Sequence, residues 1–143
     1  MIVLLNGSFG VGKATVARHL QEKLDKTSIF NPEQVGLLLS RVGVPLHFVK
    51  SETDDFQDIP QWRRLTVEGV RLWRHVLRRN VIVPMTIANP EYFDEIRSGL
   101  VQIDPDLRLF CLMAELQTIK TRLNSCGVDL ASADGRWISA RLA

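Results

Sequence analysis

A glycine-rich segment near the N-terminus has the residue types and spacing of a phosphate-binding loop. It consists of Gly7, Ser8, Phe9, Gly10, Val11, Gly12, Lys13, Ala14 and Thr15, and it contains the GxxxxGK spacing. Glycines let a backbone turn tightly and bring its N–H groups against phosphate oxygens. A lysine at this position reaches the β- and γ-phosphates of a nucleotide as a positive charge. The segment is therefore predicted to bind the phosphates of a ligand, with Lys13 as a catalytic cation.

The flanking segments fit this interpretation. Residues 2–6 are apolar and partly β-branched, which predicts a buried strand. After the loop, Val16, Leu20 and Leu24 recur every fourth residue, which is typical of an amphipathic helix. The N-terminus of such a helix adds unpaired N–H groups and a partial positive charge. The alternative is a glycine-rich turn without a ligand, but the order of strand, loop, lysine and helix favours phosphate binding.

The residue after the lysine departs from the signature. A Ser or Thr is expected there, because its hydroxyl binds Mg²⁺. This chain has Ala14 instead, followed by Thr15. One residue along a helix is a rotation of about 100°, so the hydroxyl of Thr15 cannot take the same place. Phosphate binding is thus the stronger expectation, Mg²⁺ is in doubt as a cofactor, and no residue is assigned as a metal ligand.

The composition is that of one soluble domain. The chain has 143 residues, of which 45% are hydrophobic and 24% charged, and this suits a single domain with a sizeable core. A net charge of +2 indicates no preference for nucleic acid or an anionic membrane. The two cysteines, Cys111 and Cys126, fit reduced thiols. We expect no signal peptide, no transmembrane segment and a cytoplasmic location.

Predicted strands and helices alternate along the rest of the chain. Strands are expected at 28–31, 81–85 and 107–113, and helices from Pro32 and at 61–79, 90–100 and 115–124, with a last helical fragment from Trp137. A long acidic loop is expected at 43–60. Pro84 is predicted to end the regular pairing of its strand, because proline has no N–H to donate. This alternation predicts an α/β fold with a parallel sheet and helices on both faces.

Ligands in such sheets bind at the carboxyl ends of the strands. Besides the glycine-rich loop, two strand ends are therefore predicted to contribute, at 31–33 and 84–86. The helix expected at 61–79 carries six arginines on one side, and a solvated face is the preferred interpretation except near its start. The predicted substrate-binding residues are Asn31, Glu33, Asp55, Trp62, Arg63, Met85 and Thr86.

Four blocks of the sequence together resemble the tunicamycin-resistance proteins, small bacterial P-loop proteins related to nucleoside monophosphate kinases and shikimate-kinase-like phosphotransferases. The blocks lie at 6–13, 31–36, 54–63 and 82–93. The resemblance implies a three-layer P-loop fold with a kinase-like strand order 2-3-1-4, ATP binding, and resistance to a lipophilic nucleoside antibiotic. Related kinases add a fifth strand, whereas this sequence stops at Ala143. A single nucleotide-binding domain over 1–143, truncated at its C-terminus, is expected.

The resemblance also implies roles for individual residues. Arg122 resembles the catalytic lid arginine of such kinases, whereas Cys126 stands where a second arginine often follows. Asn31 stands where many relatives carry a carboxylate, and an amide cannot accept a proton as a base does. Glu33 and Asp55 remain as acidic substitutes, or are simply helix caps and solvated charges. Ala14, Asn31 and Cys126 all depart from a full catalytic set.

Three functions stay open at this point. The chain is an ATP-dependent phosphotransferase acting on a small hydroxyl-bearing molecule, a protein that holds ATP and sequesters the antibiotic without chemistry, or an impaired relative that keeps only the fold. The expected partners are ATP and a small-molecule substrate or antibiotic, and not nucleic acid. Peripheral membrane contact through a drug tail also stays open. A homodimer is expected, because the predicted strand 107–113 would be a bare sheet edge.

Overall fold

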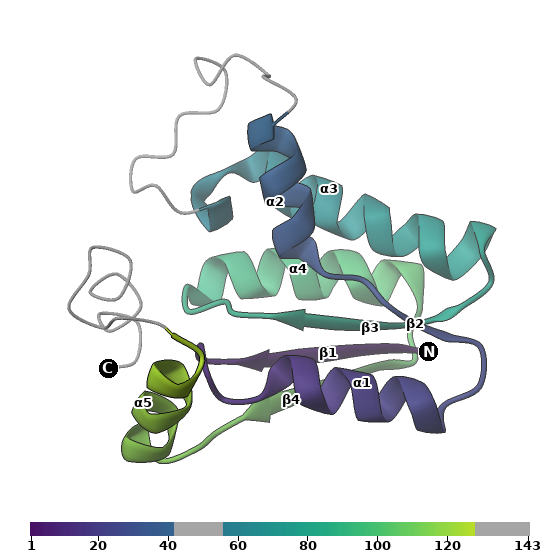
Figure 1. The fold of residues 1–143 in the computed structure, drawn as a ribbon. Coiled ribbons are helices and arrows are strands. Elements are labelled where there is room, and N and C mark those ends of the chain that lie inside the picture. The colour runs from purple at the N-terminus through teal and green to yellow at the C-terminus, as the bar shows by residue number, and fades with distance from the viewer. Residues whose placement is uncertain (42–55, 128–143) are drawn as a thin grey trace.

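One parallel sheet of four strands forms the middle layer of the fold. The structure is a computed structural model that describes residues 1–41 and 56–127 (Figure 1). The strands are β1 (Ile2–Gly7), β2 (Thr27–Ile29), β3 (Asn80–Met85) and β4 (Leu107–Leu112). They pair in the order β2-β3-β1-β4, and every pair is parallel. The predicted fold class and strand order are confirmed.

Helices cover both faces of this sheet. They are α1 (Lys13–Lys23), α2 (Pro32–Arg41), α3 (Pro60–Arg71), α4 (Pro90–Ile103) and α5 (Leu116–Ser125). In Figure 1, α3 and α4 lie on one side of the sheet and α1 lies on the other. The C-terminal half of α5 lies beside the carboxyl end of β1. Among the described residues, no helix combines the length and apolarity needed to cross a bilayer.

The core is split by the sheet into two clusters. Alternate residues of a strand point to opposite faces. Thus Leu4 faces the larger cluster under α3 and α4, whereas Leu5 faces the smaller cluster under α1, and each is only 1% exposed. The first turns of α1 are held to this face by Ala17, which is fully buried. This two-sided burial explains why residues 2–5 form one continuous apolar run.

The segment 61–79 is not one regular helix, so that prediction was wrong. α3 ends at Arg71 and continues as a π-helical turn, η3 (Leu72–Val76). The N–H of Leu77 bonds the carbonyl of Leu72 at 3.2 Å, which is the wider spacing of a π turn. Arg78 then adopts a positive φ of 51° and leads the chain into β3.

Pro84 does not end the pairing of its strand with β1, whereas the pairing with β2 stops two residues before it, at Ile82, so this prediction holds for one side of the strand only. It lies opposite Leu5, and the pairing continues to Met85. The N–H of Phe30 bonds the carbonyl of Ile82 at 2.9 Å, so the peptide groups of Ile82 face β2. Pro84 lies two residues further and faces the same side, past the end of β2. The next bond of this parallel ladder would need an N–H at position 84, so the missing N–H of Pro84 coincides with the end of the pairing with β2.

Two smaller differences between the predicted and the observed strands concern where the strands end. β2 stops at Ile29 rather than at Asn31, because Asn31 already caps α2. β4 stops at Leu112. The predicted helical fragment from Trp137 and most of the predicted acidic loop fall outside the described residues.

Candidate nucleotide-binding site

The glycine-rich loop joins β1 to α1 and depends on glycine for conformation and for space. Gly7, Gly10 and Gly12 have positive φ angles of 152°, 73° and 107°. A Cβ on Gly7 would lie 2.6 Å from the carbonyl oxygen of Leu112, and one on Gly10 would lie 2.9 Å from the side chain of Leu123. The loop is therefore fitted against β4 and α5, and side chains at these positions would displace it.

Lys13 bends back over this loop. Its Nζ donates hydrogen bonds to the carbonyl oxygens of Gly7, at 2.9 Å, and Ser8, at 2.8 Å. The ammonium also lies 5.7 Å from the centre of the Phe9 ring. Burial lowers the pKa of Lys13 below its ordinary value, and the nearby carboxylate of Glu33 works against this shift. An anion placed beside such a lysine stabilises its charged form.

The N-terminus of α1 adds a second source of positive potential. Gly12 occupies the N-cap position, where it offers no side-chain hydrogen bond, and the first turn contains no acidic residue. The N–H groups of this turn are thus not capped by their own side chains. Unpaired N–H groups and the helix dipole favour an anion at this point.

α5 places a second cation beside the loop. The Nη1 of Arg122 donates a hydrogen bond to the carbonyl of Val11 at 3.0 Å. The same helix buries Ile119 and Leu123, whose side chains pack against Gly10. This hydrophobic contact holds α5 against the loop. The position of Arg122 beside Val11 is a consequence of that contact.

These groups share one cavity of about 710 Å³. Its described lining consists of Phe9, Gly10, Val11, Gly12, Lys13, Ala14, Thr15, Val16, Asn31, Glu33, Pro84, Arg122, Leu123 and Cys126. The structure thus brings the predicted loop, Lys13 and Arg122 together with the predicted strand end at 31–33. A cavity of this size, lined by backbone N–H groups and two cations, suits a phosphorylated ligand.

At that strand end, Asn31 acts as a helix cap. Its Oδ1 accepts the N–H of Glu33 at 3.0 Å, which satisfies one free donor at the start of α2. Glu33 is exposed and lines the cavity, where its charge acts on Lys13. Of the two predicted acidic substitutes, Glu33 reaches the cavity and Asp55 lies outside the described residues.

Four other predicted substrate residues lie elsewhere and do not appear in the described lining of the cavity. Trp62 is 3% exposed, and its Nε1 donates to the carbonyl of Pro32 at 3.1 Å. Met85 is 1% exposed and belongs to the larger core cluster. Thr86 follows β3, and its buried hydroxyl has no hydrogen-bond partner among the described residues.

Arg63, the fourth, is committed to a network between α3 and α4. It is 8% exposed, and its Nε donates to the carboxylate of Glu95. Its Nη1 donates to the carbonyl of Gln57, and its guanidinium lies 4.1 Å from the centre of the Tyr92 ring. Burial and a hydrogen bond with Asp58 raise the pKa of Tyr92. Since the guanidinium is occupied by these contacts, Arg63 joins the two helices.

Asn6 was not among the predicted site residues, although it positions the loop. Its Nδ2 donates to the carbonyl of Ile87 at 3.0 Å, and its Oδ1 accepts the N–H of Ile87 at 2.9 Å. These two hydrogen bonds tie the end of β1 to the segment after β3. Its partner lies 81 residues away, so no local signal could have identified this contact.

Comparison with known proteins tests the predicted resemblance. No family model and no curated protein sequence matches the chain. The structure of a Deinococcus radiodurans tunicamycin resistance protein matches with a TM-score of 0.73 and 28% identity, over 99% of this chain and 77% of that chain. The resemblance to the tunicamycin-resistance proteins is confirmed.

Kinases of the same fold match as well. A sugar kinase from Janibacter sp. HTCC2649 gives a TM-score of 0.57 at 21% identity, over 86% of this chain and 65% of that chain. A shikimate kinase from Acinetobacter baumannii, in complex with shikimate, gives 0.58 at 16% identity, over 96% of this chain and 70% of that chain. At these identities the likeness shows the fold alone. Together with the match to the tunicamycin resistance protein, it shows that the chain has a kinase-like fold.

Proposed function

We propose that this single domain binds ATP in the cavity of the glycine-rich loop and uses it on a nucleoside-type antibiotic of the tunicamycin class. The observation that carries the proposal is the convergence of Lys13, Arg122 and the uncapped N-terminus of α1 on one cavity. The antibiotic is proposed from the likeness to the tunicamycin resistance protein.

The loop and the two cations have separate tasks in this proposal. Backbone N–H groups of the loop hold the α- and β-phosphates. Lys13 has three N–H donors and spends two on the carbonyls of Gly7 and Ser8, so it reaches the γ-phosphate with the third or by exchanging a carbonyl for a phosphate oxygen. Arg122, on α5, contacts the loop at Val11 and neutralises charge that develops on the transferred group.

Phosphoryl transfer also requires a proton acceptor. A hydroxyl oxygen of the substrate attacks the γ-phosphorus, the bond from that phosphorus to the β-bridging oxygen breaks, and ADP leaves. Glu33 is the carboxylate in the described lining of the cavity, so we assign it as the group that takes the hydroxyl proton. If Glu33 acts only electrostatically, through Lys13, the protein holds ATP and antibiotic without transfer.

One experiment separates these alternatives. Purified protein is incubated with ATP and tunicamycin, the drug is analysed by mass spectrometry, and ATP binding is measured by calorimetry. We expect ATP binding and a drug heavier by one phosphate group, with Glu33→Gln binding ATP but forming no product. ATP binding with unmodified, tightly bound drug would instead establish sequestration. No ATP binding by folded protein would refute the proposal.

We also propose that the chain forms a homodimer through β4. Within the described residues β4 pairs with β1 on one side and with no strand on the other. Leu109 and Phe110 are 43% and 52% exposed, and such an edge is a template for another strand. Light scattering at micromolar concentration should give a dimer, which Phe110→Lys should weaken. A parent that is monomeric under these conditions would contradict this.

A further inference from the structure

The start of α1 lacks the side chain that usually holds Mg²⁺ in a phosphate-binding loop. Ala14 is exposed and lines the cavity directly after Lys13. A methyl group has no lone pair to offer a cation, whereas Mg²⁺ requires six oxygen ligands at short distance. The hydroxyl of Thr15 lies one residue further, about 100° around the helix from the direction of Ala14.

The other side chains that line the cavity do not replace the missing metal ligand. Besides Thr15, Asn31 and Glu33 are the oxygen-bearing side chains in the described lining. Asn31 already accepts the N–H of Glu33, and its neutral amide is a weaker ligand for a hard cation than a carboxylate. No group of three or more carboxylate, histidine or cysteine side chains that could hold a metal occurs in residues 1–41 and 56–127. The donor set does not fit a tightly held Mg²⁺.

Positive charge is nevertheless present in the cavity. Lys13, from α1, and Arg122, from α5, both contact backbone carbonyls of the loop and line the same cavity. Together with the N-terminus of α1, they can neutralise an anion without a metal. Mg²⁺ bound to ATP removes two negative charges from the ligand. The electrostatic attraction between the cations of this site and ATP is therefore weaker when Mg²⁺ is bound to the nucleotide.

We infer that this cavity binds the metal-free form of ATP at least as tightly as Mg²⁺-ATP. The inference rests on the proposed nucleotide site and deepens it by naming the form of the ligand. It also identifies position 14 as the residue that decides this preference. A hydroxyl placed there would restore the direct metal contact.

Calorimetry tests the inference with purified full-length chain. ATP is titrated in excess Mg²⁺ and in excess EDTA, for the parent, Ala14→Thr and Ala14→Val. The Val variant has the shape of Thr without the oxygen, so it separates the hydroxyl from added bulk. Circular dichroism confirms that all three chains are folded, as expected for an exposed position.

The expected results differ between the variants. The parent and Ala14→Val should bind ATP in EDTA as tightly as in Mg²⁺, within about threefold, or more tightly. Ala14→Thr should bind Mg²⁺-ATP more tightly than metal-free ATP by roughly tenfold, since a single group that supports a metal site is commonly worth that much in metal affinity. A parent that already prefers Mg²⁺-ATP by about tenfold would overturn the inference.

Two other outcomes would also overturn it. If Ala14→Val gains the same Mg²⁺ dependence as Ala14→Thr, the hydroxyl is not the cause. If the folded parent binds ATP in neither buffer, the proposed nucleotide site itself fails. That failure is distinct from ATP binding that depends on Mg²⁺.

Discussion

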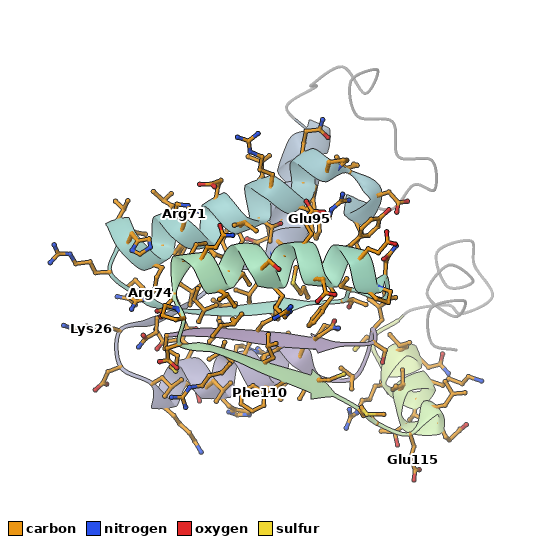
Figure 2. The ribbon with its side chains drawn as sticks, turned by 180° about the vertical axis from the view of Figure 1, so that it is seen from behind. Lys26, Arg71, Arg74, Glu95, Phe110 and Glu115 are labelled. Carbon is orange, nitrogen blue, oxygen red and sulfur yellow. The ribbon has the colours of Figure 1, made fainter. Side chains whose placement is uncertain are left out.

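The two ends of the sheet both gather charge, but they use it in opposite ways. At the amino end, the N-terminal ammonium of Met1 and the Nε of Arg74 bond one carboxylate oxygen of Asp104, at 2.7 and 2.6 Å. At the carboxyl end, Lys13 and Arg122 bond backbone carbonyls of the loop and form no ion pair among the described residues. Figure 2 shows Arg74 and Glu115, at the start of α5, near these opposite ends.

The pKa values follow this difference. Burial by itself raises the pKa of Asp104, but the hydrogen bonds from the Met1 ammonium, Arg74 and the N–H of Asp106 outweigh it and hold the pKa far below its ordinary value. At Lys13, burial prevails and lowers the pKa. A charge that is fully paired inside the protein contributes to stability, whereas a partly buried cation that forms no ion pair is available to an external anion.

The largest expected effect comes from removing the charge of Asp104, which forms the ion pairs at the amino end of the sheet. Asp104→Asn leaves two cations around a neutral amide, and we expect it to lower the free energy of unfolding by on the order of 3 kcal/mol. ATP affinity should stay unchanged, because the cavity lies at the other end of the sheet. Urea unfolding measures the first effect and calorimetry the second. Asp106→Asn is the control, since its half-exposed pair with Arg108 should contribute less than about 1 kcal/mol.

The same residue predicts a pH dependence. The folded-state pKa of Asp104 is depressed below its unfolded value near 3.8, so its contribution to stability is fully present above that value. It is lost as the pH falls from there toward the folded-state pKa. Urea unfolding at pH 7 and below pH 4 should show a smaller loss for Asp104→Asn than for the parent. Equal losses would contradict the assignment.

An intermediate effect is expected at the carboxyl end, in binding rather than stability. Lys13→Ala should weaken ATP binding by roughly ten- to a hundredfold, because a hydrogen bond to a charged group contributes about 1.5–3 kcal/mol. Lys23→Ala, in the last turn of the same helix, is the matched control and should bind ATP normally. Calorimetry in EDTA is the appropriate measurement. Unchanged affinity in Lys13→Ala would show that the loop does not bind the phosphates.

The smallest effect is expected from Arg122, whose side chain is largely exposed. Arg122→Ala should weaken ATP binding by about fivefold, close to 1 kcal/mol. Arg108→Ala removes another exposed arginine, which does not line the cavity, and should leave ATP affinity unchanged. A loss at Arg122 as large as that at Lys13 would mean that Arg122 contributes as much to ATP binding as the lysine of the loop does.

Much of the site was predictable from local sequence. The loop is a local feature, in which the strand, the glycines, the lysine and the helix follow one another directly along the chain. Their spacing alone therefore determines how they come together. The strand order followed from the family resemblance, and the alternation of elements predicted the parallel sheet. Cap residues were local as well, as Asn89 shows: its side chain accepts the N–H groups of Glu91 and Tyr92 at the start of α4.

The tertiary structure alone decided which other side chains reach the cavity. Trp62 and Met85 looked equally available in the sequence, but packing under α3 and α4 buries them in the core. Pro84 looked like a strand breaker, and only the pairing register shows that its missing N–H faces the side where β2 has already ended. The contact of Arg122 with Val11 spans 111 residues. Such placements depend on how separate elements dock, and no short-range pattern of residues encodes that docking.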